Sequence, residues 1–116
     1  ECKRLEKVEF ESNSNLQIID ESAFEYTMIE TIVIPKSVTK ICESAFLGCF
    51  HLKLIYIEDD SKLCEIKDSA FALTNIKTIS IPSGVKVLSP GAFRKCKKLE
   101  TIIFNNEKNK FEINQV

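Results

Sequence analysis

Apolar and polar residues follow the same order several times along this chain. The clearest copy is residues 34–57, IPKSVTKICESAFLGCFHLKLIYI, in which regularly placed apolar residues surround the pair Ala45-Phe46. The pair recurs at Ala23-Phe24, Ala70-Phe71 and Ala92-Phe93. Successive pairs are 22, 25 and 22 residues apart. A repeat of about 20–50 residues is typical of solenoid proteins, in which every repeat forms one coil that stacks on the next.

Each copy predicts one β-strand and one short turn. The strands are predicted at residues 29–34, 52–57, 76–81 and 99–104. These segments end in an apolar-x-apolar alternation rich in Ile, which favours a strand with one buried face. The Ser-Ala-Phe segment indicates a short helical turn with serine at the N-cap, and Pro90 would occupy the first helical position of the last copy. Because about twenty residues connect successive strands, the strands are expected to run parallel.

A second, longer period contains two copies of the first. Residues 16–62 align with residues 63–109 without a gap, and nearly all of the matching positions are apolar. We interpret this as the duplication of a pair of repeats. The third position after each repeated Phe alternates between two residue types, as Thr27, Cys49, Thr74 and Cys96.

Length and composition are sufficient for one domain. The chain has 116 residues, of which 44% are hydrophobic, and this is enough to fill one core. A coil cannot bury its apolar side alone, so the four repeated phenylalanines are expected to stack as one column. We expect residues 1–116 to form a single solenoid domain of about four and a half repeats. Because Glu1 lies in the middle of a repeat and a fifth copy begins only at Phe111 or Ile113, the chain is expected to come from a longer array.

The cysteines are predicted to be free thiols. Cys2, Cys49 and Cys96 occupy the same position of alternate repeats. Neighbouring coils are about 4.8 Å apart, so these residues are separated by about 10 Å, whereas a disulfide needs Cα atoms within about 7 Å. Cys42 and Cys64 occupy different positions and show no reason to pair. Buried free Cys acts as a small hydrophobic residue.

The phrase I-P-x-x-V-x-x-I-x-x-x-A-F-x-x-C-x-x-L-x-x-I-x-I, residues 34–57, resembles the BspA-like, or treponemal-type, leucine-rich repeat. The resemblance extends over residues 2–113. Thr27 and Thr74 depart from it by replacing Cys, and Cys42 stands where the family often has Gly. The resemblance implies the α/β class: a right-handed leucine-rich-repeat solenoid with a parallel β-sheet on its concave face and short helical or 3-10 turns. The resemblance also implies that the repeats belong to a large bacterial or protist protein, and many such proteins are surface-displayed and adhesive.

Charge and motifs exclude several function classes. Lys+Arg 16 and Asp+Glu 17 leave no overall field that would attract nucleic acid or an anionic membrane. No apolar run approaches the roughly 18 residues of a membrane helix. His51, the one histidine, is expected to face outward, away from Cys49, so no Cys–His nucleophile pair is formed. Zinc-ligand spacing and a glycine-rich phosphate loop are also missing. We therefore expect no enzyme activity, no metal and no cofactor.

Two charged clusters leave alternatives open. The acidic cluster Glu58-Asp59-Asp60, with Glu65 nearby, either holds a calcium ion or forms a solvated connector, and the connector is favoured because no EF-hand pattern is present. The other cluster is basic and either contacts an anionic polymer or simply occupies outward positions where charge is expected. It consists of Arg94, Lys95, Lys97 and Lys98, with Lys53 and Lys77 at neighbouring positions.

The predicted binding surface is the concave face, formed by the strand residues that point away from the core. Alternate residues point away from the core, and on this face they are Thr31, Val33, Leu54, Tyr56, Thr78, Ser80, Thr101 and Ile103, preceded by Lys7 and Glu9. β-branched residues suit strands in any case. That preference does not account for Leu54 and Tyr56, and Tyr is enriched at binding hot spots.

The sequence therefore favours a non-enzymatic protein-binding module, part of a surface-exposed adhesin or antigen-like protein. The alternative is a structural spacer that displays a binding site located elsewhere in a longer solenoid. The sequence does not identify the protein partner. Neither end carries a polar cap, so end-to-end self-association through the Cys2 and Phe111 ends is also expected.

Overall fold

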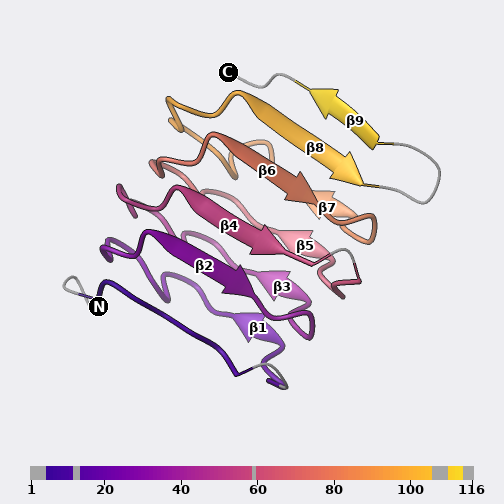
Figure 1. Cartoon of the computed structure of the whole chain (residues 1–116), viewed down its shortest axis with the longest axis horizontal. Coiled ribbons are helices and arrows are strands. Elements are labelled where there is room, and N and C mark those ends of the chain that lie inside the picture. Colours follow the sequence, from indigo (N-terminus) through magenta and orange to yellow (C-terminus); the bar gives the residue numbers. More distant parts are fainter. Residues whose placement is uncertain (1–4, 12–13, 59, 106–109, 114–116) are drawn as a thin grey trace.

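The chain forms a stack of coils, each of which contributes one long and one short strand (Figure 1). The computed structural model describes residues 5–11, 14–58 and 60–105, and the backbone of residues 110–113. The long strands are β2 (Thr31–Ile34), β4 (Leu54–Ile57), β6 (Thr78–Ile81) and β8 (Thr101–Asn105). The short strands are β1 (Ile18–Ile19), β3 (Lys40–Ile41), β5 (Glu65–Ile66) and β7 (Val87–Leu88).

The long strands run parallel and in register. β2 pairs with β4, so that Ile32 lies opposite Ile55, and β6 pairs with β8 in the same way. β4 lies beside β6 (Figure 1). Residues 5–11 run alongside β2 on the side away from β4 (Figure 1). Just before β2, the Met28 N–H donates to the Leu5 carbonyl at 2.7 Å. Identical positions of successive repeats therefore stack, and the predicted parallel-sheet solenoid of the leucine-rich-repeat type is confirmed.

The short strands form a second parallel sheet that was not predicted. It has the order β1-β3-β5-β7 and pairs Ile19 with Ile41 and Ile66 with Leu88. Each short strand has only two residues, so no alternation could be detected in the sequence. The second residue of each short strand is the more buried one, and Ile19, Ile41 and Ile66 lie in the core.

The Ser-Ala-Phe segments are turns. In the second coil, the N–H groups of Ser44, Phe46 and Gly48 donate to the third-coil carbonyls of Asp68, Ala70 and Ala72, at 3.1, 2.7 and 2.9 Å. The N–H groups between them close local turns instead. An α-helix would need all of these donors within its own segment. No helix occurs in the part of the chain that the structure describes, so the expected helical or 3-10 turns are not confirmed, and the right-handed sense of the coil stays a prediction.

The expected serine N-caps are wrong. Ser44 has φ +59°, and its counterparts Ser22 and Ser69 have φ +58° and +59°. This is the left-handed region, whereas an N-cap residue adopts an extended backbone. The left-handed residue turns the chain so that the following N–H groups point alternately along the stack and back into their own turn.

The phenylalanine column in the core is confirmed. Ring centroids are 5.3 Å apart between Phe24 and Phe46, 5.2 Å between Phe46 and Phe71, and 5.6 Å between Phe71 and Phe93. The successive rings are nearly parallel, with interplanar angles of 12°, 4° and 10°. The two central rings are fully buried, and the two outer rings are half-buried. One buried aromatic column therefore ties four coils together.

The end of the chain departs from the prediction. β9 (Lys110–Ile113) runs antiparallel to β8, with Phe111 opposite Phe104 and Ile113 opposite Ile102. The prediction that Phe111 or Ile113 begins a fifth parallel coil is therefore wrong. Only residues 106–109 separate the two strands, and a parallel crossover needs about a dozen residues or more.

Candidate functional site

The predicted binding residues lie on the outer face of the long strands, as their alternation requires. The inward residues Ile32, Ile55, Ile79 and Ile102 are buried. Of the outward residues, Thr31, Val33, Leu54, Tyr56 and Thr78 are exposed, and Ser80, Thr101 and Ile103 are half-buried. The face begins with Lys7 and Glu9, which form an exposed ion pair at 3.5 Å.

Three of these residues form an apolar patch, which we call the strand-face patch: Val33, Leu54 and Tyr56. Their exposed fractions are 53%, 60% and 59%. Val33 lies directly opposite Tyr56 in the β2–β4 register, and Leu54 precedes Tyr56 by two residues on the same side of β4. Neighbouring strands are about 4.8 Å apart, so the three side chains are contiguous. The core does not need them to be apolar.

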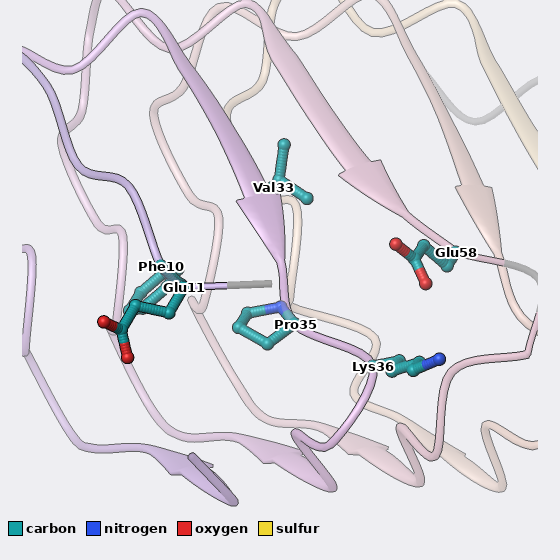
Figure 2. A pocket seen from close by; sticks show the side chains of 6 residues that line it. All are labelled: Phe10, Glu11, Val33, Pro35, Lys36 and Glu58. Carbon is teal, nitrogen blue, oxygen red and sulfur yellow. The ribbon is translucent and has the colours of Figure 1, made fainter. Parts of the chain in front are cut away.

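A pocket adjoins this patch where β2 ends, and we call it the β2 pocket (Figure 2). It is lined by Phe10, Glu11, Val33, Pro35, Lys36 and Glu58. A neighbouring hollow shares three of these residues and adds Val8 and Glu9. Figure 2 shows Val33 on β2, with Pro35 just beyond the end of that strand and Glu58 just beyond the end of β4. Val33 therefore belongs both to the patch and to the pocket.

The rim of the β2 pocket carries an excess of carboxylates. The Lys36 ammonium forms an ion pair with the Asp60 carboxylate at 3.8 Å. Within the described residues, neither Glu11 nor Glu58 takes part in an ion pair. An apolar lining beneath unpaired carboxylates suits an apolar side chain that is accompanied by a positive charge.

The residues considered for chemistry do not form a reactive site. Cys49 is buried, its thiol donates to the Phe24 carbonyl at 3.1 Å, and burial raises the pKa of this thiol. The thiol is thus held in the unreactive protonated form. His51 is exposed in the following turn. Among the described residues, no three His, Cys, Asp or Glu side chains are grouped as metal ligands, and Asp59 of the proposed acidic cluster lies outside those residues.

The cysteines that the structure describes are free. These are Cys42, Cys49, Cys64 and Cys96. Cys49 and Cys96 are buried as predicted, and Cys2 lies outside the described residues. No helix in the described part of the chain has the length and hydrophobicity to cross a membrane.

Half of the basic cluster is neutralised by ion pairs with carboxylates, and the other half has no such pair within the described residues. Arg94 binds Asp68 at 3.3 Å, and hydrogen bonds from Ser89 and Ser69 together with this arginine lower the pKa of the Asp68 carboxyl. Lys53 and Lys77 are also paired, with Glu30 at 3.8 Å and Glu100 at 4.0 Å. The three remaining cations, Lys95, Lys97 and Lys98, line a groove together with Phe50, Leu73, Thr74 and Asn75.

Sequence reasoning missed the pocket residues Phe10 and Pro35 and the groove residue Phe50. Phe10 and Pro35 come from different coils, so nothing in the linear sequence brings them together. Phe50 did give a signal. It is an aromatic residue at an outward position, directly after the repeated Cys, and it is 57% exposed.

Comparison with known proteins agrees with the solenoid fold. Residues 17–115 match the BspA type leucine rich repeat region, in six copies. The pneumococcal vaccine antigen PcpA is 32% identical in its crystal structure, with a TM-score of 0.80 over 84% of this chain and 24% of its own. A leucine-rich repeat protein from Bacteroides capillosus is also 32% identical, with a TM-score of 0.71 over 78% of this chain and 64% of its own.

A leucine rich cell surface protein from Faecalibacterium prausnitzii is 30% identical, with a TM-score of 0.68 over 74% of this chain and 22% of its own. This chain thus spans less than two thirds of the length of each of these three proteins. No curated protein sequence matches it. Since the family match covers nearly the whole repeat array, the chain belongs to the BspA-type leucine-rich repeat family.

Proposed function

We propose that this chain is a non-enzymatic protein-binding module and that its binding site is the strand-face patch together with the β2 pocket. The observation that carries the proposal is the contiguous apolar surface of Val33, Leu54 and Tyr56, which is more than half exposed. Exposed apolar groups beside polar ones are a recurrent mark of interfaces, and Tyr is enriched at binding hot spots. The rest of the predicted face, Thr31, Thr78, Ser80, Thr101 and Ile103, would form the polar and half-buried surroundings.

The β2 pocket supports a particular partner chemistry. Its lining offers Phe10 and Val33 to an apolar side chain, and Glu11 and Glu58 offer negative charge at the rim. A partner protein that inserts an apolar residue next to Lys or Arg would match both features. The likeness to a vaccine antigen and to a cell surface protein supports a place in a surface-exposed adhesin or antigen-like protein.

The alternative function is a spacer in a longer solenoid. It is favoured by one observation, that the matching segment is only 24% of the pneumococcal antigen and 22% of the Faecalibacterium protein. A spacer would carry other coils without a partner of its own. End-to-end association also stays a proposal: its Cys2 end lies outside the described residues, and β9 forms the other end of the sheet.

The experiment compares capture of surface proteins by the chain and by two double variants. Leu54→Ser with Tyr56→Ala removes most of the strand-face patch, and we expect it to abolish capture while leaving the melting temperature unchanged. Ile18→Ser with Val87→Ser is the matched control, because these residues are also apolar and exposed, at 44% and 46%, but lie on the short-strand sheet. Equal capture by both variants would contradict the proposed site. Capture by a longer protein but not by this chain would favour the spacer.

A further inference from the structure

A second surface lies on the edge of the stack where the turns lead into the long strands, and it is independent of the strand-face patch. We call it the turn-side groove. Its lining is Phe50, Leu73, Thr74, Asn75, Lys95, Lys97 and Lys98. Tyr26 extends it, because its ring lies 6.3 Å from that of Phe50.

The stacking of coils arranges these residues in order. Thr27 contacts Cys49 and Thr74 contacts Cys96 across neighbouring coils, each pair at 3.4 Å. Tyr26 and Phe50 come from the first two coils, Leu73, Thr74 and Asn75 come from the third, and Lys95, Lys97 and Lys98 come from the fourth. The surface thus changes from apolar in the first two coils to cationic in the fourth.

The apolar end is open to solvent. Phe50 is 57% exposed, and Tyr26 is 41% exposed. Tyr26 lies against Gly48 of the next coil, where an added Cβ would overlap its ring, so the absence of a side chain at Gly48 permits this close approach. The two rings form an apolar shelf that nothing in the core requires.

The cationic end is unneutralised. Lys95, Lys97 and Lys98 are exposed, and none of them forms an ion pair within the described residues. This differs from Arg94, Lys53 and Lys77, each of which has a carboxylate within 4.0 Å. The described residues that line the groove include no Asp or Glu. Three unpaired ammonium groups beside an aromatic shelf are complementary to an anionic ligand that also has an apolar part.

We propose that the turn-side groove binds an extended, acidic peptide segment of a partner protein, with an apolar side chain on Phe50 and carboxylates on the lysines. Phe50 and Lys97 are two coils apart, about 10 Å, and an extended peptide advances about 3.3 Å per residue. The segment therefore carries an apolar residue followed about three residues later by Asp or Glu. A nucleic acid fits less well, since the chain has a net charge of −1 and its unpaired groove cations are all lysines, which lack the bidentate fit of Arg for phosphate.

The test uses a fluorescently labelled peptide in which a Leu-Phe pair is followed, after two serines, by a run of aspartates. We expect saturable binding to the whole chain by fluorescence anisotropy. Two control peptides replace Leu-Phe by serines or the aspartates by asparagines, and each should bind at least about tenfold more weakly. Binding should also weaken as salt is added, because exposed charges are screened.

Variants of the chain locate the site. Lys97→Glu with Lys98→Glu should weaken the peptide at least about tenfold, and Phe50→Ser at least about fivefold. Lys62→Glu with Lys86→Glu is the matched control: it makes the same change in net charge at exposed, unpaired lysines outside the groove. Leu54→Ser with Tyr56→Ala should have no effect, which separates this site from the strand-face patch.

Several results would overturn the proposal: no saturable binding of the peptide, unchanged binding after Phe50→Ser in a chain with unchanged melting, or equal loss with the control lysine pair. A sulfated polysaccharide and a single-stranded oligonucleotide serve as competing ligands. Tighter binding of either one, dependent on the lysines but not on Phe50, would assign the groove to a polyanion instead of a peptide.

Discussion

The Oγ1 atom of Thr27 and the Sγ atom of Cys49 lie 3.4 Å apart in neighbouring coils, and Thr74 and Cys96 repeat this contact at the same distance. The alternation of Thr and Cys along the sequence therefore has a structural correlate. Each thiol faces a hydroxyl, and among the described residues no buried side-chain N or O lacks a hydrogen-bond partner. A pair of repeats, and not a single repeat, is the unit in which these buried polar groups are matched.

Removal of one hydroxyl from this arrangement should destabilise the fold. The Thr74 hydroxyl donates to the Phe71 carbonyl at 2.9 Å and is buried. Thr74→Val keeps the shape and loses the donor, so we expect the free energy of unfolding to fall by about 1 kcal/mol. Urea denaturation measures the change. Thr31→Val is the control, because Thr31 is exposed on β2 and should change stability by less than about 0.5 kcal/mol. Equal effects of the two variants would contradict this role for the Thr–Cys pairs.

The phenylalanine column should dominate stability. Phe46 is fully buried, and its ring stacks on Phe24 and Phe71. Phe46→Ala leaves a cavity between two rings, so the free energy of unfolding should fall by about 3–5 kcal/mol. Phe50→Ala removes the same number of atoms from an exposed position and should cost less than about 1 kcal/mol. A loss below about 1 kcal/mol for Phe46→Ala in thermal or denaturant melting would show that the column does not hold the coils together.

Gly48 should be far less tolerant of a side chain than Gly84. Gly48 has φ +72°, and a Cβ there would overlap the Tyr26 ring. Gly48→Ala therefore combines left-handed backbone strain of about 1–2 kcal/mol with displacement of Tyr26. At Gly84 the φ is not in that region, and the nearest atom to an added Cβ is the Leu63 carbonyl oxygen at 3.5 Å.

Melting temperatures of the two glycine variants test this difference. Gly84→Ala should be neutral or stabilising by up to about 1 kcal/mol, since alanine restricts the unfolded chain. Gly48→Ala should melt at a lower temperature, and it should also lose affinity for the acidic peptide if Tyr26 supports the apolar shelf. A Gly48→Ala chain that is as stable as wild type would show that Tyr26 does not need the close approach to the second coil.

The linear sequence was sufficient to predict the parallel strands and the Phe24–Phe46–Phe71–Phe93 column. The reason is that repeated apolar positions can be buried only if each coil stacks on an identical neighbour. The same reasoning predicted that Thr31, Val33, Leu54, Tyr56 and Thr78 would be exposed on the long strands. Inward and outward residues alternate along any strand, so the exposure of these side chains follows from sequence order alone.

Other features depended on which groups meet between coils, and the sequence of one repeat does not contain that information. Ser44 was expected to cap a helix, but its N–H donates to Asp68 in the next coil, and this exchange of hydrogen bonds between coils replaces the helix by turns. In the sequence Arg94 is equivalent to the lysines beside it, but in the structure Asp68, from the coil below, neutralises its charge.

The sequence by itself thus determined the repeat, the buried residues and the direction of the long strands, because these follow from periodic hydrophobicity. Only the tertiary structure decided the short-strand sheet, the antiparallel β9, the β2 pocket and the turn-side groove. The short-strand sheet, the pocket and the groove are each formed by residues of different coils, such as Phe10 with Val33 or Phe50 with Lys97. Their contacts depend on the register and spacing of neighbouring coils, which side-chain packing and hydrogen bonds between coils establish.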